Sequence, residues 1–146
     1  MEEAVGPVTR AEIYAFLRGH RLAVITTVSP EGSPQAAVIG IAVTEALDIV
    51  FDTLSTSRKY ANLRADPRVA LAIGWRAEQT VQVEGVAEVL SGDALDACKQ
   101  VYFTAFPDGR ERERWPDIAY VRVRPRWLRY SDFSPTPPKI EELTLP

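Results

Sequence analysis

The sequence contains few of the residues that usually build metal centres or nucleophilic active sites. It has one cysteine and one histidine in 146 residues, so it holds neither a disulfide framework nor a cluster with metal-ligand spacing. The single histidine, His20, lies at the end of the first expected helix, and we find no Ser-His-Asp set around it. Helical spacing in "DALDACKQVYF" makes Cys98 a small core residue. We therefore expect no metal and assign no catalytic side chain.

Long apolar runs and an excess of positive charge are also lacking. No run approaches the roughly 20 apolar residues that cross a bilayer, and the start "MEEAVGPVTR" lacks the basic-then-apolar order of a signal peptide. The formal charge of −3 at pH 7 gives no general attraction to nucleic acid or to an anionic membrane. These features predict a cytoplasmic protein that binds neither nucleic acid nor membrane, and any anion site in it must be local.

The chain does have enough apolar sequence for one sizeable core, since 46% of its residues are hydrophobic. Apolar, β-branched runs between turn-forming residues predict six or seven strands, in residues 22–28, 34–43, 48–53, 68–75, 80–90 and 117–133. The last of these runs is expected to divide into two strands at Pro125. Because closing a sheet removes its exposed edges, the pattern favours a mainly β, closed or nearly closed antiparallel barrel.

Helices are expected to be short and to number three or four. The clearest begins at Thr9, where Glu12 completes a capping box; others are predicted over residues 57–65 and 91–106. Residues 107–116 are expected to form a charged loop. We predict one domain over residues 1–134, followed at 135–146 by a proline-rich tail without regular structure that lies along a surface or a partner.

The strand "PQAAVIGIAV" is apolar at nearly every position and has small residues at Ala36, Ala37, Gly40 and Ala42. Such a run is typical of a central strand that is covered on both faces, by a helix or by a second subunit. A second interpretation is that the small side chains leave backbone amides close enough to bond a flat heterocycle. The pattern alone favours the first.

The stretch "STSRKYANLRADP" predicts a helix of about two turns that opens with two adjacent cations. Backbone N–H groups at a helix start carry partial positive charge and repel cations, so Arg58 and Lys59 suggest a bound anion. With Ser57 as the N-cap, these residues can form a phosphate cradle. The alternative is ordinary solvated charge, with Ser57 simply capping the helix, and the motif taken alone favours this alternative.

The order of motifs around this helix resembles the flavin-binding split-barrel family related to pyridoxamine 5′-phosphate oxidase. That family has an F-x-T, a short loop, S-R-K, a helix with N-L or N-I, and then D/N-P-R-V in the same sequence. The matching residues here are Phe51, Thr53, Ser57, Arg58, Lys59, Asn62, Leu63, Asp66, Pro67, Arg68 and Val69. The match covers residues 22–90 and implies an antiparallel Greek-key split barrel.

The resemblance also implies a cofactor site and a subunit arrangement. Ser57, Arg58 and Lys59 would hold the phosphate of flavin mononucleotide (FMN) with help from Thr53, and backbone groups of Val38 and Ile39 would meet the edge of the isoalloxazine. Thr80 stands where family oxidases place a flavin-contacting glutamine of the partner chain. A homodimer with the cofactor at the subunit interface is implied, acting as an oxidoreductase on an unidentified small molecule.

Departures from the family pattern leave two alternatives open. Family oxidases carry a further phosphate-binding arginine near Ala37, and arginine and histidine residues near the C-terminus that recognise the vitamin phosphate. This sequence has no convincing counterpart of either group. One alternative is therefore a non-catalytic module that binds flavin, haem or another tetrapyrrole. The other is a reductase that uses the deazaflavin F420.

Overall fold

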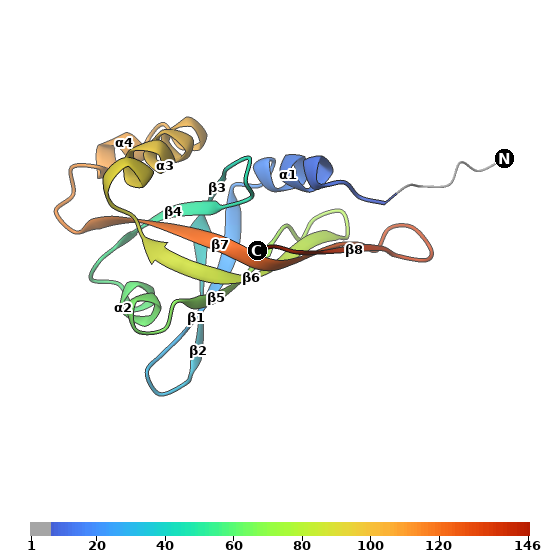
Figure 1. The fold of residues 1–146 in the computed structure, drawn as a ribbon, viewed down its shortest axis with the longest axis horizontal. Coiled ribbons are helices and arrows are strands. Elements are labelled where there is room, and N and C mark those ends of the chain that lie inside the picture. The colour runs from blue at the N-terminus through green and yellow to red at the C-terminus, as the bar shows by residue number, and fades with distance from the viewer. Residues whose placement is uncertain (1–6) are drawn as a thin grey trace.

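The computed structural model describes residues 7–146. A single antiparallel sheet curls into a half-barrel, with helices at its margins (Figure 1). The strands are β1 Leu22–Val28, β2 Pro34–Gly40, β3 Ala42–Val43, β4 Ile49–Leu54, β5 Arg68–Ile73, β6 Gln79–Val89, β7 Ile118–Asp132 and β8 Lys139–Thr144. The helices are α1 Arg10–Arg18, α2 Arg58–Ala65, α3 Gly92–Ala105 and α4 Gly109–Arg112. The predicted fold class is confirmed.

The sheet has the strand order β2-β1-β5-β6-β7-β4-β3, with β8 added to the far half of β7. Burial alternates along the strands, as in β5, where every second side chain is buried. The buried set, which includes Ile25, Phe51, Leu71 and Leu128, fills the concave side of the sheet. A smaller core lies on the outer side, where α3 covers β4 and the start of β7. Cys98 belongs to this second core, as its helical spacing predicted.

Two segments predicted to be irregular contain regular structure. The tail expectation was wrong over Lys139–Thr144, because these residues pair with β7 from Trp127 to Asp132 and form β8. The prolines of the tail all lie outside this segment, so they do not remove donors from the ladder. The predicted charged loop also contains α4, a single turn.

The expected division of the last strand at Pro125 is replaced by a β-bulge. β7 runs continuously from Ile118 to Asp132, and the register shifts opposite Glu84 and Gly85 so that β7 gains one residue. Pro125 pairs with Gly85 at this point. The proline therefore bends one long strand and does not end it.

Gly85 is required at the bulge because its backbone approaches β7 closely. A Cβ on Gly85 would lie 2.6 Å from the carbonyl oxygen of Arg124 and 3.0 Å from Cγ1 of Val123. We expect Gly85→Ala to lower the free energy of unfolding by about 1–3 kcal/mol, since two paired strands must separate to admit the methyl group. Urea denaturation measures this. Gly32→Ala is a poor control because of its positive φ, so Ala87→Gly, which removes a methyl from the same strand, serves for comparison.

Candidate functional site

The start of α2 forms as the sequence predicted. Ser57 is the N-cap, and its hydroxyl accepts a hydrogen bond from the backbone N–H of Tyr60 at 3.2 Å. The same hydroxyl lies 3.0 Å from Oγ1 of Thr53, at the end of β4. The first helical hydrogen bond is donated by Ala61 to the carbonyl of Ser57. Because Tyr60 donates to the Ser57 hydroxyl, the backbone N–H groups of Arg58 and Lys59 are the ones that point out of the helix end. The cradle geometry is thus present.

The two cations of the cradle differ in their surroundings. Arg58 is exposed, whereas Lys59 is half-buried. Burial lowers the pKa of Lys59 below its usual value of 10.5, and the charge of Asp52 only partly opposes this. Among the ion pairs of residues 7–146, none includes Arg58 or Lys59. A partly desolvated ammonium group without a paired carboxylate is a suitable place for an external anion.

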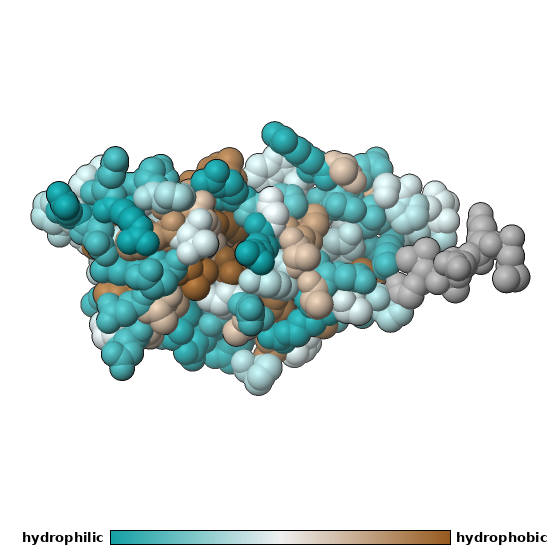
Figure 2. Space-filling view, turned by 90° about the horizontal axis from the view of Figure 1, so that it is seen from above, coloured by the Kyte–Doolittle hydropathy of each residue, from teal (hydrophilic) through white to brown (hydrophobic). Residues whose placement is uncertain are grey.

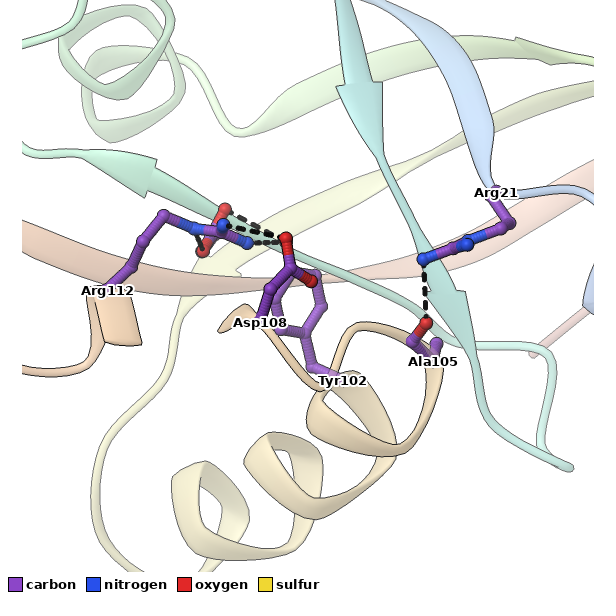
Figure 3. Close-up of polar contacts among 6 residues, drawn as sticks. Arg21, Tyr102, Ala105, Asp108 and Arg112 are labelled. Carbon is purple, nitrogen blue, oxygen red and sulfur yellow. Dashed lines mark hydrogen bonds and ion pairs between the residues drawn. The ribbon is translucent and has the colours of Figure 1, made fainter. Parts of the chain in front are cut away.

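The carboxylate of Asp52 is occupied by groups from α3 and α4. Arg112 Nε donates to Oδ2 of Asp52 at 2.8 Å, and the Tyr102 hydroxyl donates to Oδ1 at 3.0 Å. Arg112 also donates to the Tyr102 oxygen at 3.2 Å and lies 3.7 Å from the Asp108 carboxylate (Figure 3). Burial, followed by the charge of Asp52, raises the pKa of Tyr102 to about 12. Because this network holds Asp52, Lys59 keeps no close counter-ion of its own.

Asn62 fixes the position of α2 against the hairpin of β1 and β2. Its buried side-chain amide donates to Thr27 Oγ1 at 3.0 Å and to Gln35 Oε1 at 2.8 Å. A buried amide with both of its N–H groups bonded is an effective anchor. Asn62 belongs to the family motif, but the sequence alone suggests no role for it. In the structure, Asn62 joins α2 to β1 and β2.

β2 is an edge strand, and its interpretation as a central strand of the chain is wrong. It pairs with β1 alone, so alternate backbone N–H and C=O groups along it have no strand partner. Val38 faces outward and is 64% exposed, whereas Ile39 is buried in the concave core. The run also breaks at Ile41, after which it continues as β3. An edge with small outward side chains is open to a flat ligand or to a second subunit.

Six of the seven predicted site residues lie close to α2 or on β2 and β4, which meet within one chain. Thr80 lies apart from these six. The cradle on α2 leads directly into the first residue of β5, whereas Thr80 lies near the start of β6, with its hydroxyl 3.4 Å from the carbonyl oxygen of Ile73 at the end of β5. Thr80 and Ser57 therefore lie toward opposite ends of β5. The flavin contact that is predicted for Thr80 would come from a second copy of the chain.

The outer face of the sheet beside β2 is apolar and hollowed. One hollow of about 600 Å³ includes Thr26, Ala70 and Val86, and a second of about 460 Å³ extends along the same strands to Trp127. None of the helices within residues 7–146 has the length and apolar character needed to cross a membrane.

Comparison with known proteins agrees with this architecture. Residues 9–132 match the family described as pyridoxamine 5′-phosphate oxidase. A pyridoxine/pyridoxamine 5′-phosphate oxidase of Bordetella avium is 35% identical over 124 residues, which cover 78% of this chain and 57% of that protein. The chain thus spans little more than half the length of this relative.

Solved structures show the same fold at lower sequence identity. A heme binding protein from Mycobacterium smegmatis superposes with a TM-score of 0.80 at 21% identity, covering 96% of this chain and 60% of that one. A pyridoxamine 5′-phosphate oxidase-related, FMN binding protein from Nostoc punctiforme gives a TM-score of 0.69 at 12% identity, with 98% of both chains covered. Fold and sequence together define a split-barrel protein. The chain belongs to the pyridoxamine 5′-phosphate oxidase family.

Proposed function

We propose that this protein is an FMN-binding flavoprotein that acts as an oxidoreductase on a small molecule. The observation that carries the proposal is Lys59, a half-buried cation without an ion pair among residues 7–146, beside the open N–H groups of α2. Ser57, Arg58 and Thr53 surround the same point. The names of the curated relative from Bordetella avium and of the structure from Nostoc punctiforme support flavin as the ligand.

The residues present fit a phosphate monoester. A doubly charged phosphate would provide the counter-ion that Lys59 lacks and would accept hydrogen bonds from the helix N–H groups. Ala37, on β2, has no charged group to add, so Arg58 and Lys59 supply the cationic charge of the cradle. The edge backbone of β2 at Val38 and Ile39 offers unpaired donors and acceptors to a planar ring.

Bound FMN would supply the transfer of hydride or electrons, which the side chains of the chain do not perform. The chain's own part is to bind, to orient and to exclude water. Asn62 holds the cradle against the β2 edge, and the Asp52, Tyr102 and Arg112 network keeps a carboxylate from neutralising Lys59. No acid or base side chain is needed for these tasks.

The proposal includes a homodimer with the cofactor at the subunit interface. The apolar hollows beside β2 lie on an open sheet face, and an exposed apolar face of this kind usually marks an interface. A second copy seated there would cover the edge of β2 and could bring its Thr80 to the ring. Light scattering of the purified protein should report twice the mass of one chain.

The direct experiment is a visible spectrum of the freshly purified protein, with mass spectrometry of the ligand that it releases. Bound FMN and turnover of reduced nicotinamide with an electron acceptor would support the whole proposal. Protein that binds no FMN after reconstitution would refute it. FMN binding without turnover would favour the non-catalytic carrier, which is the second candidate because the sequence lacks a convincing counterpart of the family's substrate-recognising arginine and histidine near the C-terminus. Competitive titration with F420 tests the deazaflavin alternative.

Lys59→Met is expected to stabilise the ligand-free protein while weakening FMN binding. The folded-state pKa of Lys59 lies below its unfolded value, so the cost of burying the ammonium is fully present at neutral pH and declines as pH rises towards 10.5. At pH 7 the free energy of unfolding should be about 0.5 kcal/mol higher in the variant than in the wild type. The rise in this free energy between neutral and alkaline pH should be smaller in the variant than in the wild type. Thermal melts across pH measure both effects. Lys139→Met makes the same substitution at another half-buried lysine, on β8 and away from the cradle, and an equal loss of FMN affinity there would contradict the assignment.

A further inference from the structure

A cleft between α1 and α3 has the size and composition of a small-molecule site that the proposed flavin site does not use. Its volume is about 450 Å³, within the range of ligand pockets. β3 lies at its floor, and none of the seven residues proposed to hold flavin lines it. Seen from above, hydrophobic surface lies in a hollow at the positions of these helices, with hydrophilic surface around it (Figure 2).

One wall of the cleft is cationic. Arg18 is the last residue of α1, His20 and Arg21 belong to the three residues that connect α1 to β1, and all three line the cleft. Both arginines are exposed, and neither is a member of an ion pair within residues 7–146. The one acidic residue in the lining is Glu45. The lining therefore carries a net positive charge although the whole chain is acidic.

Arg21 is held in place without using up its donors. One Nη donates to the carbonyl of Ala105 at 3.0 Å (Figure 3), and the guanidinium lies 4.6 Å from the centroid of the Phe106 ring. A guanidinium has five N–H donors, and the other four remain for a ligand or for water. Such a preorganised group loses little side-chain entropy when it binds an anion.

The neighbouring surfaces of the cleft are rigid and partly apolar. The His20 ring lies against the Phe16 ring with centroids 4.3 Å apart and a tilt of 37°, and its Nδ1 lies 2.7 Å from the Phe16 carbonyl oxygen, which orients the imidazole. Half-buried Val101 and Ala105 add apolar area beside the arginines. The favourable position of Arg18 at the C-terminal end of α1 and the contact of Arg21 with Phe106 explain where these side chains lie. The arginine side chains do not fill the space between α1 and α3.

We propose that the cleft between α1 and α3 binds a small organic anion, whose carboxylate, sulfonate or phosphate group meets Arg18 and Arg21 while its apolar body covers Val101 and Ala105. The site is independent of the flavin proposal, because it lies on different elements from the cradle. Arg21 stands between the cleft and the Phe106 ring. That ring packs closely on Gly40 of β2, since a Cβ added to Gly40 would lie 3.0 Å from it.

The test uses two fluorescent probes with the same ring system. 8-Anilinonaphthalene-1-sulfonate is an apolar anion, and N-phenyl-1-naphthylamine lacks the sulfonate. With the full chain, we expect the sulfonate to bind at least roughly tenfold more tightly than the uncharged probe. Arg18→Gln with Arg21→Gln should remove this difference, since both charge-assisted contacts are lost. Arg76→Gln with Arg114→Gln changes the net charge equally at exposed positions outside the cleft and should leave it unchanged.

A blocking variant locates the bound probe. Thr104 is exposed on α3 and lines the cleft, so Thr104→Trp should fill the cleft without disturbing the core and should abolish most sulfonate binding. Circular dichroism confirms that each variant is folded. Sulfonate binding that is absent from the wild type, or that survives both the double glutamine variant and Thr104→Trp, would overturn the proposal. Neither result bears on whether FMN binds at α2.

Discussion

Replacing Arg58 and Lys59 together by alanine is expected to weaken FMN binding at least roughly tenfold while leaving the fold intact. Each side chain is proposed to make one charge-assisted contact with the phosphate, worth about 1.5–3 kcal/mol, and each 1.4 kcal/mol corresponds to about a tenfold change in affinity. Neither side chain is part of the buried core, so the free energy of unfolding of the ligand-free protein should change little. Fluorescence titration of FMN measures the affinity.

Riboflavin supplies the internal control for this prediction because it has the ring but no phosphate. Its affinity should be the same in the wild type and in the double variant. Arg64→Ala, in the last turn of the same helix, is the matched protein control, since it removes a charge from α2 at the end away from the cradle. Equal losses for FMN and riboflavin would show that the two residues support the ring and not the phosphate. Unchanged FMN affinity would refute their role.

Local signals in the sequence were sufficient for most of the strands and for the two capped helices. Thr9 caps α1 by accepting from the N–H of Glu12 at 3.1 Å, and Ser57 caps α2 in the same way. Both caps depend on residues three positions apart, which a sequence displays directly. The family motif added the expectation that Thr53 lies close to Ser57, and their hydroxyls are 3.0 Å apart.

Sheet order and long-range contacts could not be predicted from such signals. Periodicity shows that residues 34–40 form an apolar strand, but not whether a neighbour lies on both sides, so β2 was interpreted as central. β8 was missed because the prolines before it mask a short alternating run that is stabilised only by the edge of β7. Tyr102 follows Asp52 by 50 residues and Arg112 follows it by 60. No local sequence pattern connects residues so far apart.

The second large effect is expected at the ion pair between Asp52 and Arg112. Arg112→Leu removes one partner of a pair whose side chains are only 14% and 25% exposed, and it leaves the carboxylate with the Tyr102 hydroxyl alone. Breaking a fully buried pair costs about 3–5 kcal/mol, so we expect about 2–3 kcal/mol at this partly exposed site. The corresponding fall in Tm is about 5–10 °C. Arg124→Leu, which breaks a pair that is about half exposed, should cost less than about 1 kcal/mol.

A double-mutant cycle separates the pair from the loss of packing. Asp52→Asn keeps an acceptor for Tyr102 but removes the charge, so the double variant Asp52→Asn with Arg112→Leu should be more stable than the sum of the single effects implies. Additive effects would show that the ion pair contributes nothing beyond packing.

In Arg112→Leu alone, Asp52 is left without its cationic partner. In the wild type, the charge of Asp52 already opposes part of the lowering of the Lys59 pKa that burial causes. That variant should therefore show a higher pKa for Lys59 and weaker FMN binding, whereas riboflavin binding should be unchanged, because a carboxylate that is free to approach Lys59 competes with the phosphate for the same ammonium group.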